Sequence, residues 1–283
     1  MSGQGGDQYG PCLQLLRESD RDRYAATLYL PEKTRSAASA LYAFAAEIAA
    51  IPDRVKEPMA GEIRLQWWRE VILGTREAGN NPVAVALLAT LEHHELPRQP
   101  LTDLVDARVF DLYHDPMPDP TALEAYCGQT GSVLLQLVAL AGGAERDTAL
   151  ADACGHAGVA IRMSEIVRRM PLDRNAGKCP LPVTMLAATG LSVEDWLRQE
   201  PDTRHGNAAN AVIALALEHR AKAVAAIAKL DREILPVFLP LAPANSWLRA
   251  AERAGLQLLT RGVTLSPLRR QLSLAKTAFV GFR

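Results

Sequence analysis

The amino-acid sequence predicts an all-α protein, and three observations support this prediction. Alanine and leucine are abundant, aromatic residues make up only 5% of the chain, and apolar positions recur every three or four residues in most segments. That recurrence is the period of a helix that buries one face. No shift in composition marks a linker and no internal repeat is visible in the 283 residues. We therefore expect one helical domain over residues 11–283.

Proline, glycine and asparagine mark where the expected helices end. In chain order the breaks are Pro31, Pro58, Asn80–Pro82, Pro97, Pro116–Pro120, Gly142–Gly143, Pro180–Pro182, Pro201 and Pro236–Pro243. Proline lacks the backbone N–H that a helix interior needs. With typical helix lengths of ~10 to 14 residues, these breaks predict about eight to ten helices.

Residues 208–230 are an example of the helical pattern. Their apolar side is formed by Val212, Leu215, Leu217, Val224, Ile227 and Leu230, and their charge is supplied by Glu218, His219, Arg220, Lys222 and Lys229. A helix of this kind buries one face in a bundle.

Composition and charge narrow the class of protein. Hydrophobic residues make up 48% and charged residues 22% of the chain, as in a soluble globular protein. The formal net charge of −1 offers no overall field for nucleic acid. Cys12, Cys127, Cys154 and Cys179 show no metal or disulfide spacing, so we expect reduced thiols.

The sequence shows neither a targeting signal nor a membrane span. Residues 1–10 are polar and glycine-rich, and we expect them to be flexible. No window holds the ~18 uninterrupted apolar residues that a transmembrane helix needs. Peripheral contact with the inner membrane would leave no such span, and it stays open as an alternative.

Six segments share an order and spacing that is specific when they are taken together. They are Tyr29–Pro31, Ala40–Phe44, Glu62–Arg69, Leu104–Leu112, Glu124–Cys127 and Lys178–Pro182. Over nearly the whole chain this combination resembles the squalene and phytoene synthase family. The resemblance implies an isoprenoid-synthase-like helical bundle around a central cavity that holds two prenyl diphosphates.

The resemblance also implies a magnesium-dependent reaction in active relatives. There, aspartates on two facing helices hold Mg²⁺, which neutralises the pyrophosphate anion that leaves an allylic diphosphate. The first aspartate motif falls here on Ala49, Ala50 and Asp53, so only its last carboxylate is kept. Pro52 removes a backbone donor beside it and is expected to bend the helix.

The second aspartate motif falls on residues 162–173. Arg162 and Glu165 replace a glutamine and an asparagine, the arginine at Arg168 is kept, and Arg169 replaces the first aspartate. Asp173 keeps the last one. An arginine at this place repels a metal cation and can pair with the carboxylate that should bind it. Asp53 and Asp173 are therefore remnants, and we expect neither strong metal binding nor a bound cofactor.

The arginines of the second motif allow two interpretations. Arg162, Arg168 and Arg169 have the chemistry to bind a phosphate or diphosphate through bidentate contacts. Alternatively, Arg162, Glu165 and Arg169 form a salt-bridged helix face, which their spacing of three and four residues permits and which is the commoner case.

Other conspicuous residues also have a structural alternative. Tyr42, Tyr126 and Gln129 match cavity positions of the family, and each is equally explained as a buried polar group with a partner. Trp67 and Trp68 point to different sides of a helix, so at least one is expected to be core. The charged segment Asp20–Arg23 lies at a pocket position of the family. We expect His93 and His94 at a solvated helix end, and a structural role for Asp106, Arg108 and Asp111.

The pattern of losses resembles one branch of the family, the phytoene-synthase-like complex I assembly factor of mitochondria and its bacterial relatives. This resemblance implies a protein that kept the fold, gave up the reaction, and assists a respiratory complex by binding a subunit or an isoprenoid-like ligand. The competing hypothesis is a working Mg²⁺-dependent prenyltransferase that uses Glu47 or Glu165 as substitute ligands beside Asp53 and Asp173. Each glutamate lies about two helical turns from its aspartate, too far for one shared ion.

Overall fold

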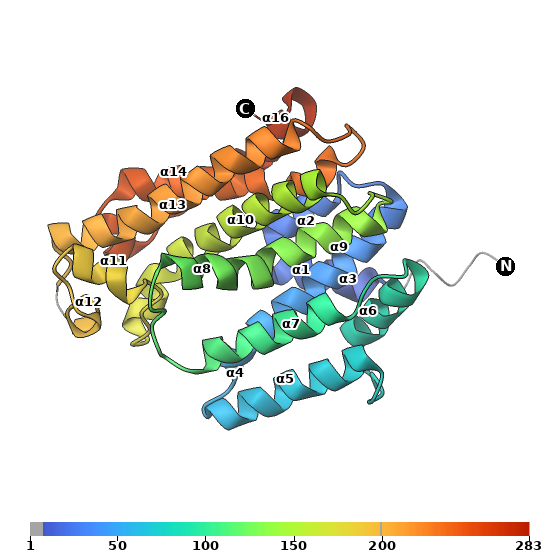
Figure 1. The fold of residues 1–283 in the computed structure, drawn as a ribbon, viewed down its shortest axis with the longest axis horizontal. Coiled ribbons are helices and arrows are strands. Elements are labelled where there is room, and N and C mark those ends of the chain that lie inside the picture. Colours follow the sequence, from blue (N-terminus) through green and yellow to red (C-terminus); the bar gives the residue numbers. More distant parts are fainter. Residues whose placement is uncertain (1–7, 199, 283) are drawn as a thin grey trace. The chain divides into compact units, whose positions relative to one another are not determined.

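The computed structural model describes residues 8–198 and 200–282, and most of these residues are helical (Figure 1). They form sixteen α-helices, two short 3₁₀ helices and one π-helical turn, with no β-strand among them. The all-α prediction is confirmed. The expected count of eight to ten helices is wrong for the described residues, because prolines and glycines cut several helices into short pieces. Eight of the α-helices have ten or more residues.

The chain divides into two compact units, and each is described by itself. The first comprises Met1–Tyr113, Val133–Ala151 and Leu230–Val237, and the second His114–Ser132, Asp152–Lys229 and Phe238–Arg283. Of the N-terminal segment expected to be flexible, residues 1–7 lie outside the described residues, and helix α1 begins within it at Gly10. The expectation of one domain over residues 11–283 stays a prediction.

The first unit is built around helix α3. Its helices are α1 (Gly10–Ser19), α2 (Arg21–Thr27), α3 (Glu32–Ala49), α4 (Ile51–Arg54), α5 (Pro58–Leu73), α6 (Pro82–His93), α7 (Gln99–Ala107), η1 (Arg108–Leu112) and α9 (Val133–Ala141). Helix α3 packs against α1, α6 and α9, so that most of its surface is buried. Small buried alanine side chains between positions 37 and 45 let the neighbouring helices approach from several sides.

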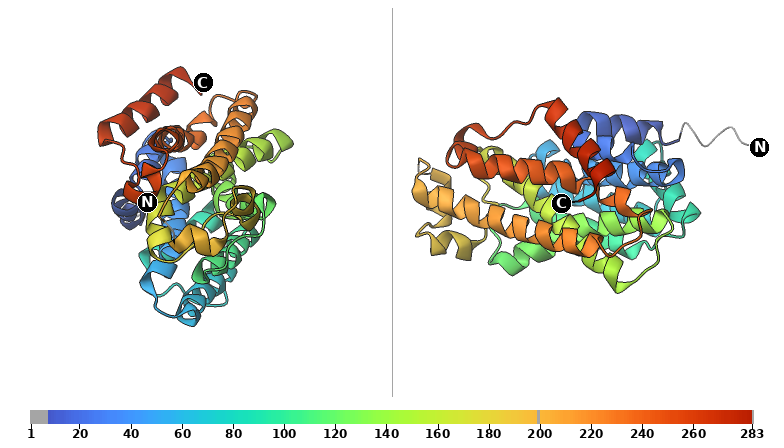
Figure 2. Two further views of the ribbon diagram at one scale, coloured as in Figure 1. Left: turned by 90° about the vertical axis from the view of Figure 1, so that its left-hand side faces the viewer. Right: turned by 90° about the horizontal axis from the view of Figure 1, so that it is seen from above.

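The second unit contains the remaining helices. They are α8 (Pro120–Cys127), η2 (Gly128–Ser132), α11 (Val183–Ala188), α12 (Val193–Arg198), α13 (Thr203–Ile227), α14 (Leu241–Ala254), α15 (Gln257–Arg261) and α16 (Pro267–Val280). Two further elements, α10 (Thr148–Asn175) and η3 (Leu235–Phe238), begin in the first unit and end in the second. Helices α13 and α14 pack side by side, and α16 lies against α14 (Figure 2).

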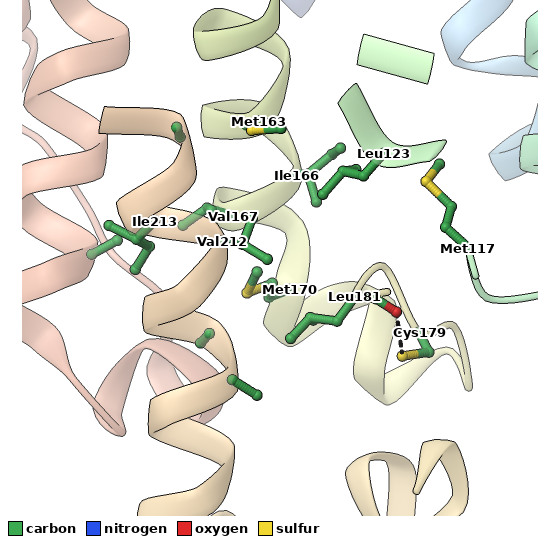
Figure 3. Packing of buried hydrophobic residues seen from close by; sticks show 14 of the residues in the cluster. Met117, Leu123, Met163, Ile166, Val167, Met170, Cys179, Leu181, Val212 and Ile213 are labelled. Carbon is green, nitrogen blue, oxygen red and sulfur yellow. Dashed lines mark hydrogen bonds between the residues drawn. The ribbon is translucent and has the colours of Figure 1, made fainter. Parts of the chain in front are cut away.

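A buried apolar cluster holds the second unit together (Figure 3). Met163, Val167 and Met170 recur at helical spacing along α10, and Val212 and Ile213 contribute from α13. Trp196 of α12 is also fully buried in this cluster. The end of α10, which carries the second motif, is therefore fixed on one side by apolar packing.

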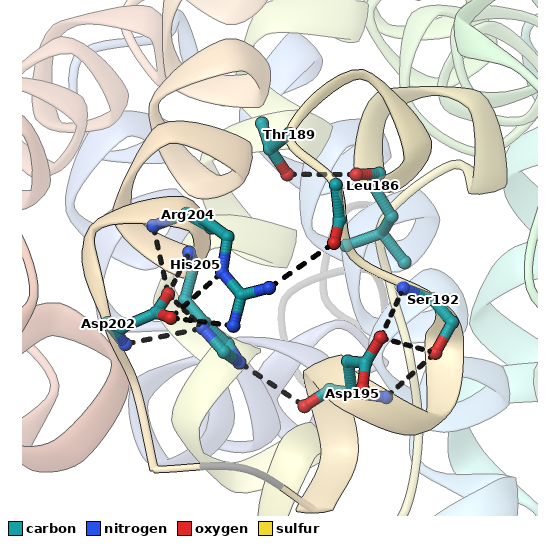
Figure 4. A network of polar contacts seen from close by, with 8 residues as sticks. Leu186, Thr189, Ser192, Asp195, Asp202, Arg204 and His205 are labelled. Atoms are coloured by element: carbon teal, nitrogen blue, oxygen red, sulfur yellow. Dashed lines mark hydrogen bonds and ion pairs between the residues drawn. The ribbon is translucent and has the colours of Figure 1, made fainter.

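A polar network orders the start of α13 (Figure 4). Asp202 caps the helix by accepting hydrogen bonds from the backbone N–H groups of Arg204 (2.9 Å) and His205 (3.3 Å). The side chains of Arg204 and His205 also donate to this carboxylate, and together these bonds hold the pKa of Asp202 well below its usual range. His205 is fully buried and stacks on Trp196, with ring centroids 5.7 Å apart. The cap thereby joins α12 to α13.

Helix α10 makes its closest backbone approach at Gly158. A Cβ atom on Gly158 would lie 2.2 Å from the Cα of Ser132, which belongs to the π-helical turn η2. A Cβ atom on Gly131 would lie 2.6 Å from the carbonyl oxygen of Gly158. Two glycines thus face each other where the helices touch. In addition, the Ser132 hydroxyl donates to the carbonyl of Gly155 at 2.7 Å.

The structure also bears on two general expectations. All four cysteines are buried and carry free thiols, as predicted. Over residues 8–198 and 200–282, no helix has both the length and the apolar content needed to cross a membrane.

Candidate functional site

The second aspartate motif lies in about the last four turns of α10, before and across Pro171. Arg162 donates to Glu165 Oε2 at 3.0 Å and to the hydroxyl of Tyr126 at 2.9 Å. Its guanidinium carbon also lies 5.4 Å from the centroid of the Tyr126 ring. Tyr126 is buried. Tyr126 is thus a buried polar group with a partner, and the pair of Arg162 with Glu165 belongs to the expected salt-bridged face.

The next two arginines point to different partners. Arg168 lies over the indole of Trp247 in α14, with its guanidinium carbon 4.2 Å from the ring centroid. Arg169 Nε lies 3.4 Å from Asp173 Oδ1, one helical turn further on. The arginine that replaces the first aspartate is thus ion-paired to the aspartate that remains.

The first motif belongs to the other unit, at the junction of α3 and α4. Helix α3 ends at Ala49, and α4 begins at Ile51 with Pro52 in its first turn, where the missing N–H is tolerated. The bend expected at Pro52 is thus a complete helix break. Asp53 is exposed on the short helix α4. The substitute ligand Glu47 has an arginine beside it, with Oε1 4.0 Å from Arg54 Nη1.

The charged segment upstream of the first motif has a structural role. Asp20 caps α2 by accepting from the backbone N–H of Arg23 at 3.0 Å, and its carboxylate also pairs with the Arg23 side chain at 2.8 Å. The guanidinium carbon of Arg23 lies 5.4 Å from the ring centroid of Tyr42, which is buried in α3. At this pocket position of the family, Asp20 and Arg23 therefore form a hydrogen-bonded ion pair with each other.

The remaining candidate residues from the sequence lie on several different helices. Gln129 is exposed on the π-helical turn, so the buried-polar alternative is wrong for it, and its cavity role stays a prediction. Trp68 is core and Trp67 is half-buried, as the spacing indicated. Arg108 and Asp111 form an ion pair, and so do Arg69 and Asp106. His93 and His94 lie at the end of α6.

Comparison with known proteins decides the family. The family model for squalene/phytoene synthase matches residues 16–269. The chain belongs to the squalene/phytoene synthase family.

Within this family, the chain is similar to proteins with two different names. It is 30% identical to NADH dehydrogenase (ubiquinone) complex I, assembly factor 6 of Bos taurus, over 93% of this chain and 80% of that protein. The human protein of the same name is 29% identical over the same shares. A phytoene synthase of Rhodobacter capsulatus is 27% identical over 68% of this chain and 57% of its own length. The resemblance to the assembly-factor branch is confirmed.

Solved structures of family enzymes confirm the fold. A dehydrosqualene synthase solved with a ligand superimposes with a TM-score of 0.80 at 16% identity, and the match covers 95% of both chains. A squalene synthase from Alicyclobacillus acidocaldarius gives a TM-score of 0.74 at 18% identity over 88% of this chain and 94% of that one. The chain therefore has the isoprenoid-synthase fold.

The residues present at the motif positions of this family member do not fit magnesium. Mg²⁺ needs several oxygen ligands, and each motif retains one carboxylate. Asp173 has Arg169 beside it, and the substitute ligands Glu47 and Glu165 are each placed beside an arginine. In the described part of the chain, no three His, Cys, Asp or Glu side chains are arranged to hold a metal ion. We derive no catalytic step through a metal.

One polar cluster in the second unit could not be foreseen from the sequence. His219 of α13 lies with Nε2 2.6 Å from Glu124 Oε1 of α8, and its Nδ1 is 3.0 Å from Nδ1 of His156 in α10. Assigning His219 to the charged side of its helix is wrong, since its side chain is buried. The three residues are 32 and 63 positions apart, so no local spacing reveals them.

Proposed function

We propose that this member of the squalene/phytoene synthase family has given up prenyl diphosphate condensation. One observation carries this proposal: Arg169 stands where active relatives have an aspartate, and its guanidinium pairs with Asp173. A cation would have to displace a guanidinium from that carboxylate and then lie beside its positive charge. Magnesium is therefore not part of the proposed function.

We infer that the protein instead assists the assembly of respiratory complex I. The support is its similarity to assembly factor 6 along 93% of the chain, whereas the match to a phytoene synthase covers 68% of the chain. An assembly protein needs a binding surface rather than a reactive centre, which is consistent with a kept fold and altered motifs. The proposed partners are a subunit of the complex and an isoprenoid-like ligand such as a prenyl diphosphate.

The proposed site of action is the cytoplasmic side of the inner membrane, with peripheral contact. Complex I is a membrane complex, so a protein that assists its assembly must reach the membrane surface. The guanidinium groups of Arg162, Arg168 and Arg169 have the chemistry for an anionic headgroup or a diphosphate. They already have neighbours within the protein, so any such ligand would compete with Glu165, Trp247 and Asp173.

An activity assay with purified protein tests the loss of catalysis. The full chain is incubated with farnesyl or geranylgeranyl diphosphate and Mg²⁺, and pyrophosphate release is measured beside an active phytoene synthase. We expect release at the level of the protein-free control. Turnover that depends on both protein and Mg²⁺ would establish the prenyltransferase alternative and overturn the proposal.

A deletion strain tests the assembly role. Complex I is quantified in native gels and by NADH oxidation in membranes, with and without a plasmid that restores the gene. We expect complex I to fall while other respiratory complexes stay at their normal levels. Unchanged complex I in the deletion strain would count against the assembly role, whatever the activity assay shows.

A further inference from the structure

One segment of this nearly neutral chain carries basic residues and no acidic residue. Residues 253–283 contain six of the 31 basic residues and none of the 32 acidic residues, whereas the whole chain carries a formal charge of −1. This segment includes α15 and α16 of the second unit. Its charge is therefore uncompensated within the segment, unlike that of an ordinary mixed surface.

Helix α16 uses one face to pack against the unit. Leu274 is buried, and the hydroxyl of Ser273 donates to the carbonyl of Ala242 in α14 at 3.1 Å. The hydroxyl of Ser246 in the same helix lies 3.1 Å from the Ser273 hydroxyl. These contacts fix the rotation of α16 about its axis, and so determine which residues face outward.

The outward face of α16 is apolar. Leu268, Leu272 and Phe279 are 65%, 60% and 86% exposed, although side chains of this kind are normally buried. Their spacing of four and then seven residues places all three within an arc of roughly 40° on the helix, at ~100° per residue. The exposed residues therefore form one continuous stripe.

Cations border this stripe. Arg269 and Lys276 are exposed, and helix geometry places both roughly 80–100° from Leu268, along one edge of the stripe. A surface helix with an apolar stripe, a basic edge and no acidic residue is the pattern of a helix that lies in a membrane interface. The rim of a protein–protein interface, by contrast, normally carries charges of both signs.

We propose that α16 docks on the surface of an anionic phospholipid bilayer. Leu268, Leu272 and Phe279 enter the boundary between headgroups and acyl chains, while Arg269 and Lys276 contact lipid phosphates. The fourteen-residue helix lies parallel to the bilayer and does not cross it. This inference deepens the peripheral membrane contact proposed above, and names the surface that makes it.

Vesicle flotation of the full chain tests the proposal. Vesicles of phosphatidylcholine alone are compared with vesicles that also contain phosphatidylglycerol, at low and high salt. We expect binding only to the anionic vesicles, and weaker binding as salt rises. Binding to both kinds of vesicle alike, or to neither, would overturn the proposal and direct the search to an acidic protein partner.

Paired variants locate the contact. Leu272→Ser with Phe279→Ser should reduce vesicle partitioning at least about tenfold, because two apolar side chains no longer leave water. Arg269→Gln with Lys276→Gln should reduce it roughly fivefold for each charge removed. The matched control is Met59→Ser with Ile63→Ser, which removes an equally exposed apolar pair from α5 in the first unit. An equal loss in the control pair would contradict the assignment to α16.

Folding and function are read separately. All variants change exposed residues, so thermal melts should stay close to that of the unchanged chain. A failure of vesicle binding would leave the proposed assembly role intact, since complex I levels in the deletion strain are measured independently. Conversely, vesicle binding by α16 would stand even if complex I levels did not change.

Discussion

Arg169 lies one helical turn before Asp173 in α10. This spacing predicts what happens when Arg169 is replaced by the aspartate that active family members have at this position. Arg169→Asp would place two carboxylates at positions i and i+4 on one helix face, where like charges repel by about 0.2–0.5 kcal/mol. A cation that bridges them would remove that repulsion. We expect the variant to gain a Mg²⁺-dependent rise in melting temperature of roughly 1–2 °C that the unchanged chain lacks.

Arg198→Asp is the matched control for this prediction. Arg198 also forms an ion pair with an acidic residue four positions away, Glu194, but it lies outside the aspartate motifs on α12. The Mg²⁺ response should be larger in Arg169→Asp. Equal responses would mean that Mg²⁺ acts on surface charge in general, and not at the motif.

Gly158 is required where α10 meets the π-helical turn, and a substitution there should be costly. A Cβ atom at this position would meet the Cα and N atoms of Ser132 at 2.2 and 2.3 Å, and backbone cannot move aside as a side-chain end can. We expect Gly158→Ala to lower the free energy of unfolding by about 1–3 kcal/mol, measured by urea denaturation.

Gly155 supplies the comparison within the same helix. A Cβ atom at Gly155 would have no heavy atom within 4 Å, and alanine is the better helix former. Gly155→Ala should therefore be neutral or stabilising by up to ~1 kcal/mol. The prediction for Gly158 is wrong if both variants denature at the same urea concentration.

At the scale of elements, a histidine pair links α8, α10 and α13. Donation from His219 Nε2 to Glu124 leaves Nδ1 of His219 as an acceptor, so His156 donates from its own Nδ1. Burial lowers the pKa of His156, and the neighbouring His219 and Lys222 act in the same direction, whereas Asp152 and Glu124 oppose them. With its Nδ1 proton facing His219, His156 would take up a further proton on Nε2, which lies 3.5 Å from Asp152 Oδ1, and its ring would then carry a positive charge beside His219.

The lowered pKa makes stability depend on pH with a definite sign. Because the unfolded chain binds a proton on His156 more readily than the folded chain, the free energy of unfolding falls as pH drops below about 6.5. His156→Asn removes the titrating group, so its stability should fall less between about pH 7.5 and 5.5, as followed by thermal melts. The exposed His114, which lies outside this cluster, supplies the control variant His114→Asn. A variant profile parallel to that of the unchanged chain would contradict this account.

For the whole molecule, sequence patterns predict what depends on local order and spacing. Alanine- and leucine-rich periodicity predicts the helices, and the altered motifs can be placed because Ala49 and Arg169 fall in register with the family segments. The ion pair of Arg169 with Asp173 follows from a spacing of four residues. The helical periodicity and the ion pair depend on residues within one or two helical turns, so both can be predicted without the tertiary structure.

Features that depend on distant segments could not be predicted in the same way. The partners of Tyr126 and His219 lie 36 and 95 residues away along the chain. The exposed stripe of α16 has the same spacing as a buried face, and the contact of Ser273 with α14 and the burial of Leu274 decide which side faces outward. Similarly, Gln129 follows the buried Tyr126 by three residues, yet the π-helical turn leaves it exposed.

The retained aspartates give the sharpest test of what the whole molecule does. If complex I assembly needs the fold and its surfaces but no metal chemistry, a chain with Asp53→Asn and Asp173→Asn should restore complex I in the deletion strain as fully as the unchanged gene. Loss of the partly exposed ion pair with Arg169 should cost about 1 kcal/mol, so the protein level should be maintained. Native gels and immunoblots measure both quantities in the same membranes. Normal protein with missing complex I would show that these carboxylates still act, because asparagine keeps their size and removes only their charge.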